Sequence, residues 1–263
     1  MCGIIGILSN CDINIYKFLL ESLIQLQNRG YDSSGVCLMN NDFIIHKYAS
    51  TKTEDSIEKL TNIDIDLNNT NIGIGHNRWA THGPKNDINA HPHISNNGKF
   101  IVVHNGIIEN FLKLKNFLIE KGYKFYSGTD TEIIVNLIEY YSNQQTNFMD
   151  VIKTTINNLS GTYGLIILNL EENNKMYCVR NGSPLLLGYN DEYAIITSEQ
   201  SGFCNKVNTY ITLHNDDIAC IELNNKNIKV NYNHIYDYKN INLIDFEKSP
   251  SPYDHWTIKE IYE

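Results

Sequence analysis

The chain has 263 residues, of which 42% are hydrophobic and 11% are aromatic, and only 5 are prolines. This composition supports a folded core and excludes wholesale disorder. The 21 lysines and arginines are outnumbered by 30 aspartates and glutamates, and the basic residues are scattered along a chain of net charge −9. The sequence therefore predicts no nucleic-acid partner and no membrane partner.

The cysteine pattern and the start of the chain predict a cytoplasmic protein. The longest apolar runs, such as Ile4 to Leu8, fall far below the roughly 20 residues that a membrane helix needs. Acidic and polar residues follow almost at once, which is not the pattern of a signal peptide. The 6 cysteines are far apart and include no CxxC pair, so we expect reduced thiols.

Hydrophobic periodicity predicts strands at both ends of the chain and helices between them. Up to residue 104 the predicted elements are, in order, a strand, a helix, a hairpin of two strands, a short helix and two further strands: Cys2–Leu8, Ile15–Gln27, Val36–Met39, Phe43–Tyr48, Glu54–Leu60, Ile72–His76 and Phe100–His104. Three helices follow, at Asn110–Lys121, Asp130–Tyr141 and Met149–Leu159. The remaining elements are strands at Tyr163–Leu170, Met176–Arg180, Pro184–Gly188, Ala194–Ser198, Asp217–Leu223 and Ile228–Tyr232.

This order of elements predicts an α+β fold in which two sheets lie between helical layers, a four-layer αββα sandwich. No internal repeat and no Pro/Gly-rich linker interrupts the chain before residue 245. We therefore expect residues 1–245 to form one domain. The tail 246–263, with Pro250 and Pro252, has the composition of a linker.

Cys2 is the first candidate for chemistry. Removal of Met1 is sterically easy before a small side chain, and it would leave a thiol nucleophile and a free α-amino base on one residue. The thiolate is the reactive form of cysteine, and an α-amino group with a pKa of about 7.7–8.0 exchanges protons near neutrality. The alternative is a small buried residue that opens a strand.

The tripeptide His104-Asn105-Gly106 is expected to end a strand in a turn. There the Asn105 side-chain amide and the Gly106 backbone N–H lie side by side, and two such donors are what an oxyanion hole needs. The alternative is an ordinary Asn-Gly turn, because asparagine is frequent throughout this chain.

A second candidate set combines Arg78, Thr81, His82 and Asp130. The guanidinium suits a carboxylate and the Asp130 carboxylate suits an ammonium group, so a zwitterionic amino acid fits both. The alternative is that Arg78 and Asp130 form a surface ion pair of little energetic weight.

Metal and dinucleotide sites are not expected. Imidazole is a common zinc ligand, and five histidines lie close together in the sequence: His76, His82, His91, His93 and His104. No spacing among them matches a zinc signature, and no cysteine is interleaved. Gly73-Ile74-Gly75 begins a GxGxxG pattern, but Arg78 occupies its last position, so we expect no cofactor.

Taken together, the motifs resemble one family, the glutaminase domain of glutamine–fructose-6-phosphate aminotransferases, which are class II glutamine amidotransferases. The motifs that carry this resemblance are Cys2-Gly-Ile-Ile-Gly-Ile7, Asn28-Arg-Gly-Tyr-Asp-Ser-Ser-Gly35, His76-Asn-Arg-Trp-Ala-Thr-His-Gly83, Asn89-Ala-His-Pro-His93, Val103-His-Asn-Gly-Ile-Ile-Glu-Asn110, Gly128-Thr-Asp-Thr-Glu132, Arg180-Asn-Gly-Ser-Pro184 and His255-Trp-Thr-Ile-Lys-Glu-Ile-Tyr-Glu263. Several motifs in the same order are far more specific than any one of them. The resemblance spans essentially the whole chain.

The resemblance implies an N-terminal nucleophile hydrolase fold with two antiparallel sheets. It implies that Cys2 attacks the side-chain amide of L-glutamine to form a thioester, and that Asn105 and Gly106 hold the oxyanion. The roles implied for substrate binding are the α-carboxylate on Arg78, the α-ammonium on Asp130, and a closing loop formed by Thr81 and His82. Arg29 matches a position beside the nucleophile, and Trp79 matches one at the start of the ammonia path.

The domains that bind fructose 6-phosphate in this family would lie beyond Glu263. The sequence therefore predicts hydrolysis of glutamine to glutamate and ammonia, with glucosamine 6-phosphate made only through missing isomerase domains or a partner chain. Two alternatives stay open: a non-catalytic glutamine-binding or regulatory module, and a glutaminase domain that serves another acceptor. A homo-oligomer is possible on the sequence alone.

Overall fold

Two antiparallel sheets form the centre of the protein. The computed structural model describes residues 2–63, 70–241 and 262. In these residues the larger sheet contains, in spatial order, β14 (Lys239–Asn240), β11 (Thr209–Thr212), β9 (Leu186–Tyr189), β10 (Tyr193–Thr197), β1 (Gly3–Ser9), β4 (Ile72–Arg78), β2 (Ser33–Met39) and β3 (Phe43–Ala49). The smaller sheet contains β13 (Asn227–Asn231), β12 (Ile218–Asn224), β8 (Lys175–Asn181), β7 (Gly161–Asn169), β6 (Phe100–Ile108) and β5 (His93–Ile94).

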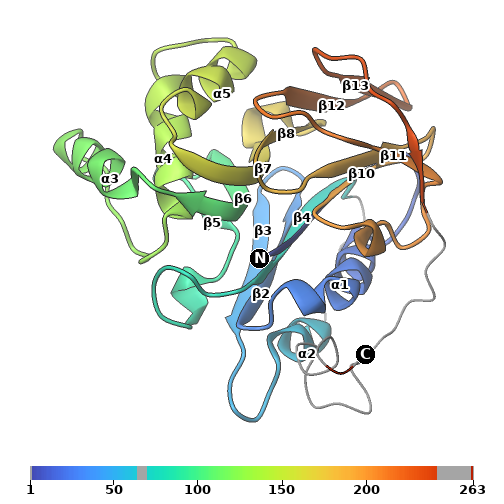
Figure 1. Cartoon of the computed structure of the whole chain (residues 1–263), viewed down its shortest axis with the longest axis horizontal. Coiled ribbons are helices and arrows are strands. Elements are labelled where there is room, and N and C mark those ends of the chain that lie inside the picture. The colour runs from blue at the N-terminus through green and yellow to red at the C-terminus, as the bar shows by residue number, and fades with distance from the viewer. Residues whose placement is uncertain (1, 64–69, 242–261, 263) are drawn as a thin grey trace.

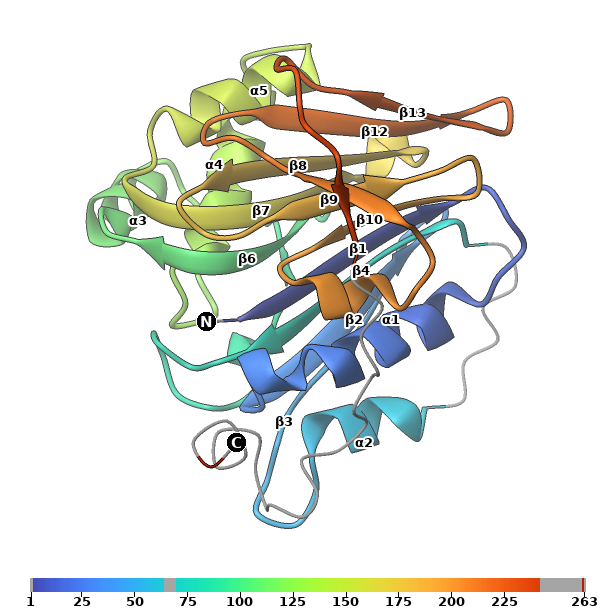
Figure 2. The same cartoon turned by 45° about the vertical axis from the view of Figure 1, so that its right-hand side comes forward.

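Helices cover the outer faces of both sheets, as Figures 1 and 2 show. The larger sheet is covered by α1 (Ile15–Gln25) and α2 (Ser56–Thr61), whereas α3 (Phe111–Glu120), α4 (Thr131–Ser142) and α5 (Phe148–Ile156) pack on the smaller sheet. The expected α+β fold, a four-layer αββα sandwich, is therefore confirmed. Among the residues described, no helix has both the length and the apolar character needed to cross a membrane.

The alternation of side chains along β1 explains how the layers hold together. Ile4 and Leu8 point into the core between the two sheets, while Ile5 and Ile7 point into the core under α1. This is the two-residue period of a strand that is buried on both faces. Gly6 lets the sheets approach, because a Cβ atom there would lie 2.8 Å from the sulfur of Met176 on β8.

The first two helices begin at polar caps. The Asn14 side chain accepts a hydrogen bond from the Lys17 backbone N–H at the start of α1. At α2, Asp55 and Glu58 form a reciprocal capping box. Both arrangements satisfy backbone donors that the first turn of a helix leaves unpaired.

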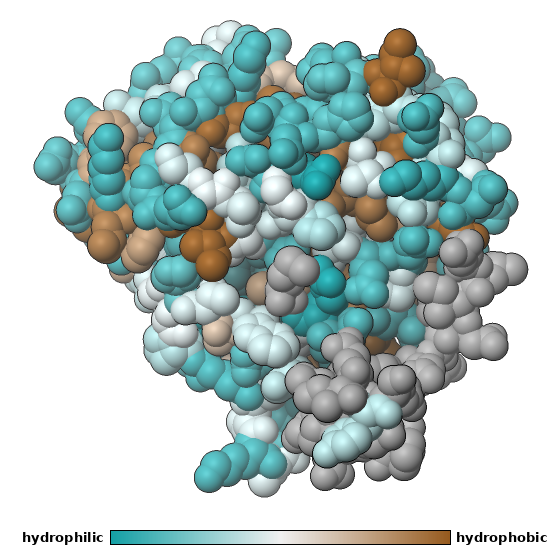
Figure 3. Space-filling view, in the orientation of Figure 1, coloured by the Kyte–Doolittle hydropathy of each residue, from teal (hydrophilic) through white to brown (hydrophobic). Residues whose placement is uncertain are grey.

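The surface in Figure 3 is largely hydrophilic, in keeping with the acidic composition. Apolar side chains gather at the left of that view, where Figure 1 shows α3. This helix packs beside α4, buries Leu114 and Leu118 in the core that α4 shares with the smaller sheet, and leaves Leu112 and Ile119 exposed. Only one face of α3 therefore contributes to the core.

The predicted elements are found, with two differences. The strand expected to end at His104 continues as β6 to Ile108, so the turn predicted at Asn105-Gly106 is wrong. The ladder to β7 extends through both residues, and it overrides the local preference of an Asn-Gly pair for a turn. Strands β5, β11 and β14 were not predicted. Of the predicted linker 246–263, all but Tyr262 lies outside the described residues.

Candidate active site

Cys2 lies where the two sheets meet, immediately before β1. Strand β1 pairs with β4 with Gly3 opposite Asn77, which brings the residue after β4, Trp79, alongside Cys2. The Trp79 backbone N–H donates to Cys2 Sγ over 3.4 Å. The Cys2 backbone N–H donates to Oδ1 of Asn105, on β6 of the other sheet, over 3.0 Å. Groups from both sheets therefore hold this cysteine.

Asn105 presents a donor beside the thiol that the described structure leaves unused. Its Oδ1 holds the Cys2 amide, and its Nδ2 is buried with no hydrogen-bond partner among the described residues. A buried donor without an acceptor costs about 1–3 kcal/mol. The adjacent Gly106 has φ +146°, and a Cβ atom there would lie 2.0 Å from the Thr162 carbonyl oxygen. Gly106 lines the pocket that contains Cys2, whereas Asn105 is not among its lining residues.

Arg78 is the last residue of β4 and is buried, with 3% of its surface exposed. Its guanidinium donates to the carbonyl oxygens of Gly83 and Pro84, each over 3.3 Å, and to the carbonyl oxygen of His82. The loop after β4 thus folds back over the guanidinium. Burial lowers the pKa of Arg78, and the nearby carboxylate of Asp130 opposes that shift. A carboxylate ligand would replace these carbonyl acceptors.

Asp130 is held by the same strand that carries Asn105. It is buried, with 4% exposed, and its Oδ2 accepts the backbone N–H of Ile108 over 2.8 Å. It precedes α4 but makes no side-chain capping bond there. The alternative of a surface ion pair with Arg78 is wrong, because both side chains are buried and no ion pair joins them within the described residues.

Buried histidines form a wall behind the pocket: His76, His91, His93 and His104. The Thr131 hydroxyl is hydrogen-bonded to His91 Nε2 over 2.8 Å and to His104 Nδ1 over 3.0 Å. The Thr129 hydroxyl is hydrogen-bonded to His93 Nε2 over 3.0 Å. Burial lowers the pKa of all four rings, to about 3 for His76. These uncharged rings pack against the segment that carries Asp130.

Burial also raises the pKa of the Cys2 thiol. The Trp79 N–H and the positive charge of Arg78 oppose this shift, and the charge of Asp130 adds to it. The thiolate is therefore scarce at neutral pH unless a base removes the proton. The described part of the chain holds no group of three or more side chains arranged to bind a metal ion.

The structure brings most of the predicted site residues to one pocket. Its lining includes Cys2, Arg78, Trp79, Thr81, His82, Gly106 and Asp130. The cavity holds only about 10 Å³, the room for about one water molecule. A ligand the size of glutamine does not fit into this volume.

Arg29 does not line this pocket. Its Nε lies 3.6 Å from the Glu199 carboxylate, and its Cβ packs 3.4 Å from the position that a Cβ on Gly3 would take. It therefore supports the start of β1 behind the nucleophile. Four further residues line the pocket: His91, His104, Thr129 and Thr131. Sequence reasoning considered the two histidines only as possible metal ligands and did not assign the two threonines to the site. The motifs Asn89–His93, Val103–Asn110 and Gly128–Glu132 contain these four residues.

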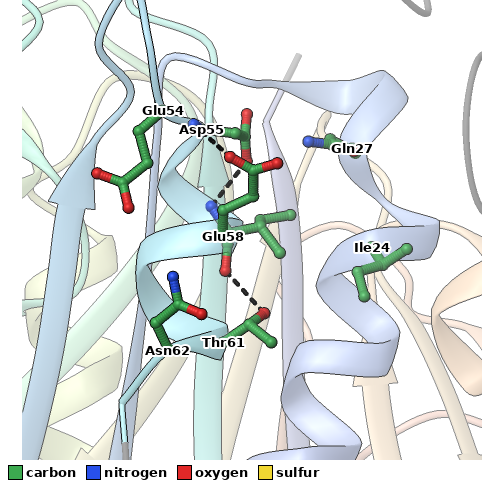
Figure 4. A pocket seen from close by; sticks show the side chains of 8 residues that line it. Ile24, Gln27, Glu54, Asp55, Glu58, Thr61 and Asn62 are labelled. Carbon is green, nitrogen blue, oxygen red and sulfur yellow. Dashed lines mark hydrogen bonds between the residues drawn. The ribbon is translucent and has the colours of Figure 1, made fainter.

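A larger cavity of about 480 Å³ lies between α1 and α2. Figure 4 shows the side chains that surround it, among them Asp55, Glu58 and Thr61. The Asp55 and Glu58 carboxylates accept backbone N–H groups of the capping box. The Thr61 hydroxyl donates to the Ile57 carbonyl. These side chains form hydrogen bonds with the backbone at the two ends of α2, and none of the residues around this cavity is a cysteine.

Comparison with known proteins agrees with this pocket. The family model of the glutamine amidotransferase domain matches residues 76–205. A probable glutamine–fructose-6-phosphate aminotransferase of Acanthamoeba polyphaga mimivirus is 37% identical over 267 aligned residues, and the enzyme of Thermococcus kodakarensis is equally similar. The enzyme of Staphylococcus aureus is 36% identical over 268. The matched part of the chain is a glutamine amidotransferase domain.

These matches cover 100% of the amidotransferase chain and 43% of each relative, so the chain spans less than half the length of the curated relatives. A solved structure of glutamine phosphoribosylpyrophosphate amidotransferase from B. subtilis has a TM-score of 0.71 and 23% identity. It covers 88% of the amidotransferase chain and 49% of its own. This likeness shows the fold and confirms the expected N-terminal nucleophile architecture.

The buried histidines predict how the stability of the amidotransferase depends on pH. Their folded-state pKa values are lowered, so unfolding takes up protons below the unfolded value of about 6.5. Stability is full above that pH and falls as the pH drops, by about 1.4 kcal/mol per pH unit for each histidine that stays neutral in the fold. Urea denaturation between about pH 7 and about pH 5.5 measures this. A free energy of unfolding that does not change over this range contradicts it.

Proposed function

We propose that this domain hydrolyses L-glutamine to glutamate and ammonia with Cys2 as the nucleophile. The main support for the proposal is the side-chain amide of Asn105. Its Oδ1 accepts the Cys2 backbone N–H, and its Nδ2 is a buried donor without a partner among the described residues. Such a donor suits the oxygen that becomes negative when a thiol attacks an amide. The match to the glutamine amidotransferase domain supports the same reaction.

In the proposed binding mode, the α-carboxylate of glutamine replaces the carbonyl acceptors of Arg78, and its α-ammonium pairs with Asp130. Both groups are buried, and both line the pocket that contains Cys2. Charge-assisted hydrogen bonds of this kind are stronger than neutral ones. Thr81 and His82 lie on the exposed loop that opens for glutamine and closes over it.

The chemistry runs in two steps. Cys2 Sγ attacks the side-chain amide carbon, and the amide oxygen takes the negative charge against Asn105 Nδ2 and the Gly106 N–H. The carbon–nitrogen bond then breaks, and ammonia leaves with the proton that the thiol gave up. Water hydrolyses the resulting thioester to glutamate and restores the thiol. With Met1 removed, the α-amino group of Cys2 is the base that transfers these protons.

We also propose that this ammonia is passed to fructose 6-phosphate to make glucosamine 6-phosphate. The support is the name of the curated relatives, glutamine–fructose-6-phosphate aminotransferases, of which the chain spans 43%. The acceptor would be bound by a part of the protein beyond this chain or by a partner chain. In this proposal, residues 1–245 are the amidotransferase domain of a cytoplasmic enzyme, and 246–263 lead to the acceptor domains.

Replacing the nucleophile tests the proposal. We expect Cys2→Ala to abolish glutamate release while glutamine still binds, because Arg78 and Asp130 remain in place. Glutamate is measured by a coupled assay, with intact mass on the same sample to establish whether Met1 is present. Cys11→Ala, which removes a half-buried thiol outside the pocket, is the matched control and retains activity. Unchanged release from Cys2→Ala overturns the proposal, whereas binding without turnover in a chain that begins at Cys2 favours a glutamine-binding module.

The oxyanion role of Asn105 has its own test. Asn105→Ala removes the unpaired donor, and we expect kcat to fall by about 10²–10³, as for other single oxyanion donors. Steady-state kinetics on glutamine measure the change, and circular dichroism establishes that the variant is folded. A folded variant that loses less than about tenfold contradicts this role.

A further inference from the structure

Lys47, on the edge strand β3, binds a loop of the active-site wall through all of its donors. Its ammonium donates to the carbonyl oxygens of Ala90 over 2.7 Å, Pro92 over 3.1 Å and Ile88 over 3.4 Å. An ammonium group has three N–H donors. Each of them therefore has an acceptor in the single segment 88–92.

Two neighbours of Lys47 allow segment 88–92 to lie close to β3. Gly35 on the neighbouring strand β2 leaves room for the loop, because a Cβ atom there would lie 2.0 Å from the His91 carbonyl oxygen. The Asp87 carboxylate accepts the backbone N–H of Ala49 on β3 over 2.7 Å. The segment 87–92 is thus attached to β3 at two points. It also covers an edge that would otherwise stay unpaired.

The segment that Lys47 holds connects the two loops of the proposed amino-acid site. Asn89 Nδ2 donates over 2.7 Å to the Pro84 carbonyl, which is also an acceptor of Arg78. Asn89 Oδ1 accepts the backbone N–H of Gly128 over 2.8 Å, two residues before Asp130. His91 of the segment is hydrogen-bonded to Thr131, and His93, just after the segment, is hydrogen-bonded to Thr129.

We propose that Lys47 is a positioning residue for glutamine binding: its charged ammonium fixes segment 88–92, and through Asn89 that segment sets the distance between the Arg78 loop and Asp130. Lys47 itself does not line the pocket. The inference rests on the proposed function, because it assigns Arg78 and Asp130 to the two charged ends of glutamine. The inference predicts that loss of Lys47 weakens glutamine binding and leaves the chemical step little changed. The reason is that Cys2 and Asn105 are positioned by β1 and β6 and not by segment 88–92.

Lys47 changes its charge at a pH where glutamine binding can be measured. Burial lowers the pKa of Lys47 to about 8, opposed by Glu132 of α4 and Asp87 of the loop. From β5, the His93 ring faces the same charge, and it is neutral because its own pKa is lowered. Above about pH 8 the ammonium loses a proton and one carbonyl loses its donor. Arginine at this position stays charged at any such pH.

The test measures glutamine binding by titration calorimetry in the 263-residue chain carrying Cys2→Ala, so that no turnover occurs. Lys47→Met and Lys47→Arg are compared in this background at about pH 7 and about pH 9. Lys59→Met is the matched control, because Lys59 Nζ donates to a single carbonyl, that of Ala49, over 2.8 Å and does not contact the segment.

At about pH 7 we expect Lys47→Met to weaken binding about tenfold or more, because small misplacements of binding groups are costly. Lys59→Met should have no such effect. Lys47→Arg should bind like the parent at about pH 7 and more tightly than the parent at about pH 9. The α-amino group of glutamine titrates equally in all chains, so the ratio between variants isolates Lys47. With Cys2 restored, KM rises while kcat changes little.

Equal binding by the parent and Lys47→Met overturns the inference, and so does an equal loss in Lys59→Met. If Lys47→Met does not fold, the comparison of the parent with Lys47→Arg at about pH 9 decides, and equal binding there contradicts the proposal. If the folded Cys2→Ala chain binds no glutamine at all, the proposed function fails. Amide hydrogen exchange of residues 88–92 then tests Lys47 alone, and exchange unaffected by Lys47→Met overturns its role.

Discussion

The hydrogen bond from the Cys2 amide to the Asn105 side chain joins the two sheets at the point where chemistry is proposed. Cys2 precedes the central strand of one sheet, and Asn105 lies within a strand of the other. Because the amide oxygen of Asn105 is committed to this bond, its nitrogen has only one remaining direction. The proposed oxyanion hole would therefore follow from how the sheets stack.

The amino-acid side of the pocket is built differently, from three loops. One folds over Arg78, one carries Asp130, and segment 88–92 connects them through Asn89. Loops can move where sheets cannot, and the cavity of about 10 Å³ shows that this side is closed. In the proposed mechanism, movement of the loop would let glutamine reach a nucleophile that is already held in place, and water would still have to reach the thioester to release glutamate.

Much of this was predictable from the sequence, for identifiable reasons. Periodicity located the helices and most strands, since buried faces repeat every two or about 3.6 residues. Cys2, Arg78 and Asp130 were found because residue chemistry and a family resemblance pointed to the same positions. These assignments of role stay predictions until they are tested.

Other features depend on contacts that no local pattern encodes. The course of β6 through Asn105 and Gly106 depends on its pairing with β7, which is more than fifty residues away. The hydrogen bonds of Lys47 depend on β3 packing against a segment that lies some forty residues later in the chain. Both require the tertiary fold, so single-sequence reasoning assigned a turn to the first and nothing to the second.

The most direct measurement is a crystal structure of the Cys2→Ala chain with glutamine bound. The account predicts the amide oxygen of glutamine against Asn105 Nδ2, its α-carboxylate on Arg78 and its α-ammonium on Asp130. Glutamine bound with its side-chain amide turned away from Asn105, or bound in the cavity between α1 and α2, would contradict it.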